Sequence, residues 1–147
     1  MANYTHILVA VDFSDSAKKV LNKAKEIAER NQANISLLHV VEYLPPIDSA
    51  YEPILASNWS IDENQLIEQA NSSLQKMSTD HGMIGAKLNV VLGTPKYEIS
   101  QFVKTGQCDL VILGSHGRHG ISLLLGSTAN AVLHDMPCDI LAVKVNE

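Results

Sequence analysis

The stretch GSHGRHGISLLLGST, residues 114–128, combines the residue types that bind phosphate groups. Glycines let the backbone approach an anion closely and adopt positive φ angles, so that successive amide N–H groups converge on the anion. The closing GST begins a helical pattern, and the exposed N–H groups and dipole at a helix start attract negative charge. Arg118 adds a cation for a charge-assisted hydrogen bond. The stretch therefore predicts phosphate binding.

A carboxylate and the glycine stretch each follow directly on an apolar run of the sequence. Asp12 in VDFS follows the run 6–11, as the glycine stretch follows the run 109–114. Ligands of open parallel sheets bind beyond the carboxyl ends of the strands, where the strand order reverses. If these two strands are neighbours, the two stretches face each other and form a nucleotide site. The Asp12 carboxylate, which only accepts hydrogen bonds, then suits the ribose hydroxyl groups.

The glycine spacing by itself leaves a purely structural turn open as the alternative. Gly114, Gly117 and Gly120 follow the pattern G-x-x-G-x-x-G, which is neither a dinucleotide fingerprint nor a P-loop. His116 and His119 have no third ligand near them in the sequence, so we predict no metal site. No G-x-S-x-G elbow for a nucleophilic serine occurs, and we predict no catalytic residues.

The elements that must position these residues alternate along the chain. Continuous apolar runs, typical of parallel strands buried on both faces, occupy 6–11, 34–41, 86–92, 109–114 and 139–145. Helical patterns lie between them, over 14–31, from Ser60 to about 80, from Thr94 onward, and over 127–134. Such alternation predicts an α/β fold with a parallel sheet and helices on both faces.

Several local signals refine these elements. Ser14 suits the N-cap of the first helix, and Asp15 complements the helix dipole in its first turn. Thr94 and Pro95 suit the N-cap and first position of the third helix. His39, inside an apolar run, is predicted to be a hydrogen-bonded core residue. The long connection 42–59 indicates a lid or partner surface, with a mobile loop as the alternative.

The composition is that of one globular domain, which we expect to span residues 1–147. The net charge of −5 argues against a general nucleic-acid binder, which needs a basic face. No signal peptide or membrane-spanning run is apparent, and we expect a cytoplasmic protein without membrane contact. Cys108 and Cys138 are too few and too widely spaced for a disulfide framework or zinc site, and are predicted to be small buried thiols.

Three segments together resemble the universal stress protein family, and they cover essentially the whole chain: ILVAVDFSDSA, LLHVVE and DLVILGSHGRHGISLLLGSTANAVLHDMPCDILAVKV. The resemblance implies an adenine nucleotide alpha-hydrolase-like fold, with a five-stranded parallel sheet in strand order 3-2-1-4-5. One branch of the family binds ATP through a G-x-x-G-x9-G-[ST] motif. Another branch lacks the motif and binds no nucleotide.

The resemblance also implies which residues would bind ATP or AMP, with Mg²⁺ as an accompanying ion. Gly114 and Gly117 match the first two glycines of the motif, and Gly126 with Ser127 matches its end. The full candidate set is Ala10, Val11, Asp12, Val40, Leu113, Gly114, Gly117, Arg118, Gly126, Ser127 and Thr128. In this set Asp12 corresponds to the acidic residue near the ribose, and Val40 to the position whose backbone meets the adenine.

One departure from the family motif bears on function. Eight residues, RHGISLLL, separate Gly117 from Gly126 where the motif has nine. The leading interpretation is an ATP-binding stress-response module with at most weak ATP hydrolysis. Two alternatives stay open: a dimer that binds no nucleotide and acts only through protein contacts, and an ATPase or phosphotransferase that uses Asp12 with Mg²⁺.

The last apolar run, CDILAVKV, predicts an assembly. In the implied strand order it forms an edge strand, and a long apolar edge pairs readily with a second copy about a twofold axis. Family resemblance implies the same pairing, so we expect a homodimer built on the C-terminal strand.

Overall fold

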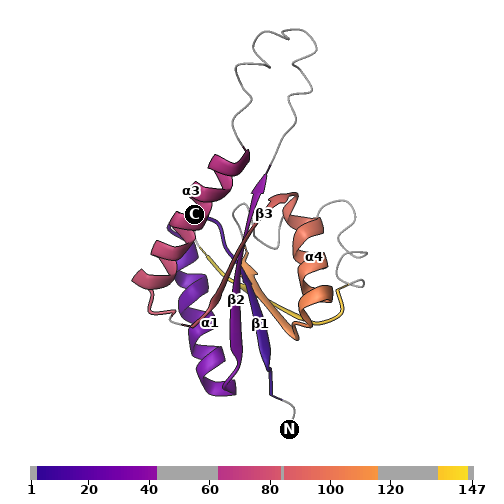
Figure 1. Ribbon diagram of the computed structural model, residues 1–147. Helices are drawn as coiled ribbons and strands as arrows, with labels where there is room; N and C mark the ends of the chain where they lie inside the picture. Colours follow the sequence, from indigo (N-terminus) through magenta and orange to yellow (C-terminus); the bar gives the residue numbers. More distant parts are fainter. Residues whose placement is uncertain (1–2, 43–62, 84, 116–135, 146–147) are drawn as a thin grey trace, which may run out of the picture.

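The computed structural model describes residues 3–42, 63–83, 85–115 and 136–145 (Figure 1). Its elements follow in the order β1 (His6–Ala10), α1 (Ala17–Asn31), β2 (Asn34–Glu42), α3 (Glu63–Asp80), β3 (Lys87–Gly93), α4 (Pro95–Gly106), β4 (Leu110–Gly114) and β5 (Asp139–Val143). The helix predicted over 127–134 and the long connection 42–59, apart from Glu42, lie outside the described residues.

The five strands form one parallel sheet in the order β3-β2-β1-β4-β5. The predicted fold class and strand order are therefore confirmed. Continuous apolar runs produce this arrangement because central strands are covered on both faces: every residue of Ile7–Ala10 and of Leu110–Gly114 is buried. The order reverses beside β1, since the chain passes outward through β2 and β3 and then returns to β4 on the other side.

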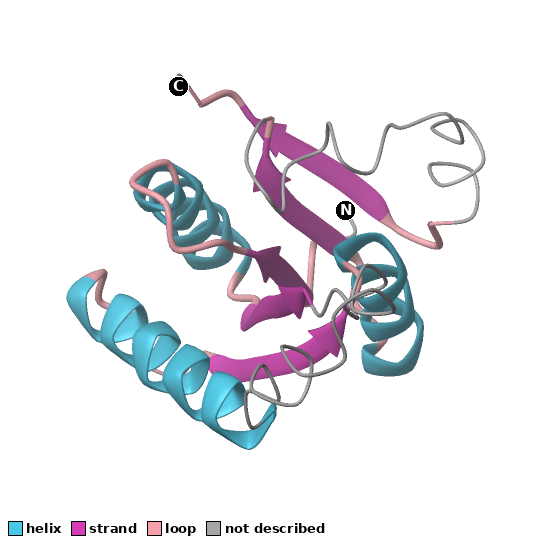
Figure 2. Ribbon diagram, turned by 90° about the horizontal axis from the view of Figure 1, so that it is seen from above, coloured by secondary structure: helices cyan, strands magenta, loops and turns pink. Residues whose placement is uncertain are grey.

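Two apolar layers cover the faces of the sheet. Helices α1 and α3 lie on one side and α4 on the other (Figure 2). Strand residues alternate between the layers: Ile7, Val9 and Val11 pack in the α1 and α3 layer, while Leu8 and Ala10 pack in the α4 layer. This alternation follows from the two-residue repeat of a strand, and it fixes which side chains at each strand end point to which face.

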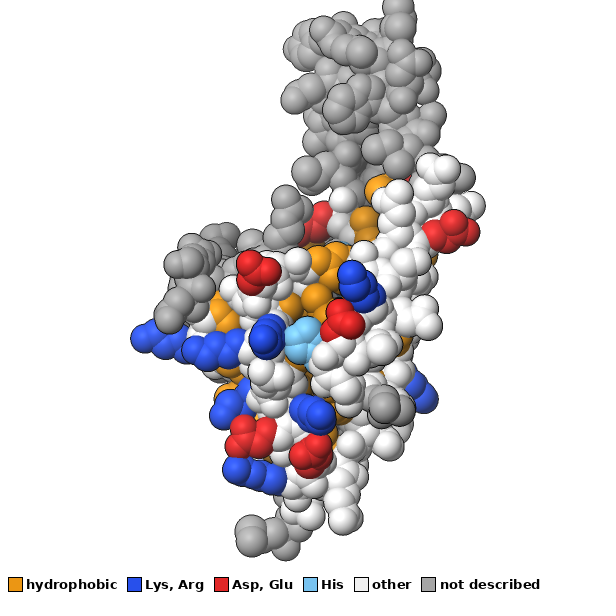
Figure 3. Space-filling view, turned by 90° about the vertical axis from the view of Figure 1, so that its left-hand side faces the viewer, with side chains coloured by type: hydrophobic (Ala, Val, Ile, Leu, Met, Phe, Trp, Pro, Cys, Tyr) orange, Lys and Arg blue, Asp and Glu red, His pale blue; other side chains and the backbone are white. Residues whose placement is uncertain are grey.

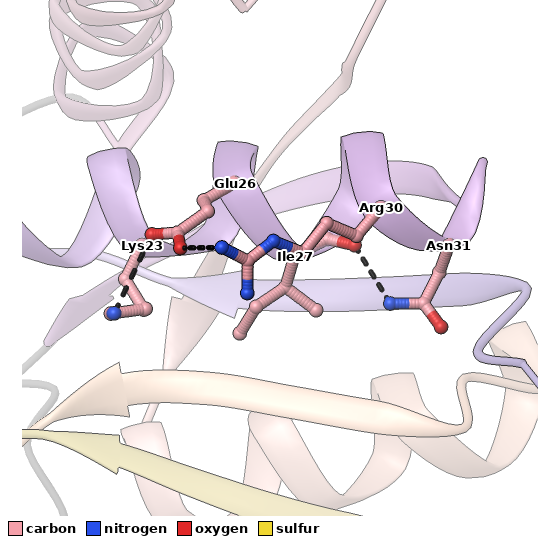
Figure 4. A network of polar contacts seen from close by, with 5 residues as sticks. All are labelled: Lys23, Glu26, Ile27, Arg30 and Asn31. Carbon is pink, nitrogen blue, oxygen red and sulfur yellow. Dashed lines mark hydrogen bonds and ion pairs between the residues drawn. The ribbon is translucent and has the colours of Figure 1, made fainter.

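Helix α1 has a charged outer surface and a polar tie at its end (Figure 4). Glu26 contacts Arg30 at 2.8 Å and Lys23 at 3.5 Å, one helical turn away in each direction. Asn31 donates from Nδ2 to the Ile27 carbonyl oxygen at 2.8 Å and accepts from the Tyr4 N–H at 3.2 Å. Asn31 thus links the end of α1 to the chain entering β1.

The predicted N-cap of α1 is wrong by two residues. The helix begins at Ala17 with Ser16 as its N-cap, and Asp15 lies before the first turn. Ser14 is not the cap, because its N–H and hydroxyl both donate to Asp12 Oδ1. For α4 the prediction is confirmed: Thr94 is the N-cap in extended conformation and Pro95 begins the helix.

A polar network closes the amino end of the sheet. The Asp109 carboxylate accepts from the Thr5 N–H, the Thr5 hydroxyl and the His6 N–H at 2.8, 3.0 and 3.0 Å. His6 also joins two neighbours, with Nε2 2.7 Å from the buried Ser36 Oγ and Nδ1 3.0 Å from the Gly106 carbonyl oxygen. Because Ser36 is 1% exposed, this Ser–His pair is structural and not a candidate nucleophile.

Among the described residues, no helix combines the length and the apolar character that crossing a membrane requires.

Candidate functional site

The candidate site lies where β1 and β4 end side by side. The two strands pair in parallel, with Ile7, Leu8 and Val9 opposite Leu110, Val111 and Ile112. Their carboxyl ends therefore meet at the same edge of the sheet, at the point where the strand order reverses. This confirms the condition on which the sequence-based site depends, because Asp12 follows β1 and Gly114 ends β4, its neighbour.

The Asp12 carboxylate is oriented by its own loop. Its Oδ1 atom accepts from the Ser14 N–H at 3.0 Å and from the Ser14 hydroxyl. This local turn is one that aspartate forms readily, since its short side chain reaches the backbone two residues on. The side chain lies just beyond the buried Ala10 and Val11, each 2% exposed, at the margin between core and surface.

The backbone N–H and C=O groups of Val40 are directed toward β1. The Val11 N–H donates to the Leu38 carbonyl oxygen at 3.0 Å, so Leu38 directs its backbone groups toward β1. Alternate residues of a strand direct their N–H and C=O groups to the same side. Val40 therefore also directs these groups toward β1, at the level where the chain turns away into the Asp12 loop. Its side chain is buried in the α4 layer.

His39 packs under the Asp12 loop. Its Nδ1 atom lies 2.8 Å from the Val11 carbonyl oxygen, and its ring stacks on Phe13 with centroids 4.1 Å apart. Burial lowers the pKa of His39, although the Val11 carbonyl and the carboxylates of Asp12 and Glu42 act in the opposite direction. The predicted hydrogen bond of His39 is confirmed, whereas the predicted core location is not, because the residue is half-buried. No sequence signal indicated that its partner would adjoin Asp12.

Strand β4 delivers the start of the glycine stretch to the site. Leu113 is fully buried, and Gly114 pairs with Val143 of β5. Beyond them the Ser115 N–H donates to the Val143 carbonyl oxygen at 2.8 Å, and the Ser115 hydroxyl accepts from the Val145 N–H. The remaining candidates lie outside the described residues: Gly117, Arg118, Gly126, Ser127 and Thr128.

A groove of about 610 Å³ adjoins the Asp12 loop on the outer face of α1 and α3. Its lining includes Phe13, which is 41% exposed, Met77 of α3, and His81, the residue directly after α3. Figure 3 shows lysine and acidic side chains interspersed around a histidine on this face. The mixture of both charges gives the groove no preference for an anion or a cation, and sequence periodicity alone does not reveal it.

The other reactive side chains do not join the candidate site. Cys108 is buried, Cys138 is half-buried, and both are free thiols at the opposite, amino end of β4 and β5. Within the described part of the chain, no group of three or more His, Cys, Asp or Glu side chains is placed to hold a metal ion. His116 and His119 fall outside that part.

Residues 3–144 match the model of the universal stress protein family. The chain belongs to this family. Among its relatives is "Universal stress protein A homolog 2" of Coxiella burnetii (strain RSA 493 / Nine Mile phase I), which is 39% identical over 99% of this chain and 98% of its own.

Solved structures of family members share the architecture of this universal stress protein. The universal stress protein UspA from Lactobacillus plantarum is 30% identical, covers 97% of this chain and 99% of its own, and superposes with a TM-score of 0.64. A universal stress protein solved in complex with cAMP is 22% identical, covers 97% and 98%, and has a TM-score of 0.63. At that identity the second likeness concerns the fold alone.

Proposed function

We propose that this chain is an adenine-nucleotide-binding universal stress protein that takes ATP or AMP, with Mg²⁺, at the carboxyl edge of β1 and β4. The observation that carries the proposal is the placement of Asp12 and Gly114 at the ends of two paired strands beside the reversal of strand order. Asp12 binds the ribose hydroxyl groups, and the backbone of Val40 meets the adenine edge. The glycine stretch from Gly114 to Thr128 binds the phosphates.

The chemistry of the described residues supports this assignment. Asp12 is a hydrogen-bond acceptor oriented by Ser14 at the sheet edge, as a ribose contact requires. Val40 belongs to β2, the strand that pairs with β1, and lies two residues beyond Leu38, which is opposite Ala10. A family member that crystallises with cAMP supports an adenine-containing ligand for this fold. Because Asp12 is assigned to the ribose in this proposal, and not to a general base, we expect at most weak ATP hydrolysis.

Calorimetric titration with ATP and Mg²⁺ tests the nucleotide site. The wild type should bind, and Gly126→Val should abolish binding, because a side chain at this position would occupy the space that a phosphate must enter. Gly106→Ala is the matched control, since an added Cβ there meets only ordinary contacts from 3.5 Å outward. The control should bind like the wild type, and both variants should melt within a few degrees of it.

The eight-residue spacing between Gly117 and Gly126 favours a second candidate, a dimer that acts only through protein contacts. A wild type that gives no heat at millimolar ATP, and that purifies without adenine nucleotide by mass spectrometry, would support this candidate and overturn the first. A nucleotide found in the denatured protein would settle the choice in favour of binding.

We also propose a homodimer formed through β5. Strand β5 is an edge of the sheet, with β4 on its inner side, and among its residues Asp139 and Ala142 are exposed and Ile140 and Leu141 are half-buried. Backbone groups along such an edge can pair with those of a second copy about a twofold axis.

We propose a cytoplasmic location as well, since ATP and AMP are intracellular nucleotides.

A further inference from the structure

His39 belongs to β2, yet it contacts the residues on both sides of Asp12. Its Nδ1 atom lies 2.8 Å from the carbonyl oxygen of Val11, the residue before Asp12. Its ring stacks on Phe13, the residue after Asp12, at a centroid distance of 4.1 Å and an interplanar angle of 30°. One side chain of the neighbouring strand therefore holds both flanks of the candidate ribose ligand.

We propose that His39 is a positioning residue for nucleotide binding: by fixing Val11 and Phe13 it sets the location of the Asp12 carboxylate at the carboxyl edge of β1. The inference rests on the proposed function, in which Asp12 binds the ribose. His39 itself touches no nucleotide in this assignment and acts through Asp12.

The chemistry of the contact makes His39 suited to this role. The Val11 carbonyl can only accept, so Nδ1 carries the proton and donates it. Burial favours the neutral ring, which stacks on an aromatic face without the cost of desolvating a charge. The imidazole thereby combines a directional hydrogen bond with a flat apolar surface, and no other side chain of similar size provides both.

The location of the contact also matters. The last described bond between the main chains of β1 and β2 joins the Val11 N–H to the Leu38 carbonyl oxygen. The bonds from Ser14 to Asp12 orient the carboxylate within the loop. The His39 contacts connect that loop to the sheet, one residue beyond the end of the paired segment. A displaced loop would keep its internal turn but carry Asp12 away from the edge.

Three substitutions separate the two contacts of His39. Asn places an amide N–H near the location of Nδ1 and removes the ring, whereas Phe keeps the ring and removes the donor. Leu removes both. We expect His39→Leu to weaken ATP binding about three- to tenfold, the range for a lost neutral hydrogen bond, and His39→Asn and His39→Phe each to restore part of the affinity.

A double-mutant cycle with Asp12→Ala distinguishes positioning from general destabilisation. If His39 acts through Asp12, His39→Leu should change the dissociation constant in the wild-type background and leave it unchanged in the Asp12→Ala background. His6→Asn is the matched control: this histidine also bonds a main-chain oxygen through Nδ1, but at the amino end of the sheet. It should lower the melting temperature without changing the dissociation constant measured below the transition.

The outcomes separate this inference from the proposed function. A wild type that binds ATP, with His39→Leu equally harmful in both backgrounds or harmless in the wild type, overturns the positioning role alone. A wild type that does not bind overturns the proposed function and this inference with it. Hydrogen exchange on the ligand-free protein adds a direct check, because the Ser14 amide should exchange at a changed rate in His39→Leu while amides in the middle of α1 keep theirs.

Discussion

At the scale of single residues, Asp12 lies where the buried chain of the sheet meets the surface. The chain before Asp12 must remain in the buried core, and Asp12 itself must present a carboxylate at the surface. Val11 satisfies the first by packing in the core at 2% exposure, and the Ser14 turn satisfies the second by holding Oδ1. The same turn removes Ser14 from the helix cap, so α1 begins later than its sequence signals indicate.

Replacing Asp12 with Ala should weaken adenine-nucleotide binding about ten- to a hundredfold, the effect of losing a hydrogen-bond partner that carries charge. The fold should persist, because the two bonds that the carboxylate accepts from Ser14 lie within the loop and not in the core. Calorimetric titration measures the affinity, and circular dichroism checks the fold. An unchanged dissociation constant would mean that the ribose is bound elsewhere.

Two other residues illustrate how burial controls reactivity. Burial raises the pKa of the Cys108 and Cys138 thiols to about 11, with smaller contributions from Asp109 and neighbouring groups. Because the thiolate is the reactive species, both should react with iodoacetamide at pH 8 about two orders of magnitude more slowly than a free cysteine of pKa about 8.5. Mass spectrometry of alkylated peptides, with glutathione as the reference thiol, measures the rates. Reaction at the rate of glutathione would contradict the prediction.

At the scale of elements, β1 and β4 are joined at their amino ends by a side chain as well as by the backbone hydrogen bonds of the sheet. Asp109 stands directly before β4 and bonds the entry to β1 through Thr5 and His6. The connection explains why these two strands, distant in sequence, start at the same level. Because the two strands start at the same level, Asp12 and Gly114 come close to each other at their carboxyl ends.

Asp109→Ala should lower the free energy of unfolding by about 1–3 kcal/mol, since two backbone N–H groups lose their acceptor. Burial alone would raise the pKa of Asp109, but the hydrogen bonds from Thr5 and His6 outweigh it and lower the pKa. A lowered pKa in the folded state stabilises the protein above the unfolded value of about 3.9, and this contribution is lost as the pH falls through the folded value.

Urea denaturation at pH 7 and below pH 4 tests both parts of this prediction. The difference between wild type and Asp109→Ala should shrink in acid. Asp139→Ala is the control, because its exposed carboxylate accepts one bond from the Tyr4 hydroxyl at 2.7 Å. A larger loss of stability in Asp139→Ala than in Asp109→Ala would contradict the assignment.

At the scale of the whole molecule, the sheet has two edges, β3 and β5, that differ in their proposed use. Val143 directs its carbonyl toward β4, where it accepts from Ser115, so Ala142 directs its N–H outward. On the other edge, the registers of β1 with β2 and of β2 with β3 place the Val90 N–H outward in the same way.

Proline at these two positions distinguishes the edges. Ala142→Pro removes an outward N–H, adds a ring on the edge, and should convert the dimer to a monomer while the β4 ladder stays intact. Val90→Pro makes the same change on β3 and should leave a dimer. Light scattering at micromolar concentration measures both. A monomeric wild type, or a dimeric Ala142→Pro variant, would overturn pairing through β5.

Much of the fold follows from local sequence. The apolar runs predict the strands to within one or two residues at most ends, as in 34–41 against the observed Asn34–Glu42. Thr94 and Pro95 predict the start of α4 because capping depends on a few adjacent residues. The predicted N-cap at Ser14 is wrong because its hydroxyl donates to the nearby Asp12 carboxylate and does not cap the helix. Sequence spacing does not indicate which of these two interactions a serine makes.

The sequence by itself determined the alternation of strands and helices, the chemistry of Asp12, and through its family pattern the order of the strands. These features are local or repeat across the family. Only the tertiary structure decided that His39 flanks Asp12, because the two residues lie 27 positions apart and meet through the register of β1 on β2. Register is set by packing across the whole sheet, and a change of one residue would turn His39 to the opposite face.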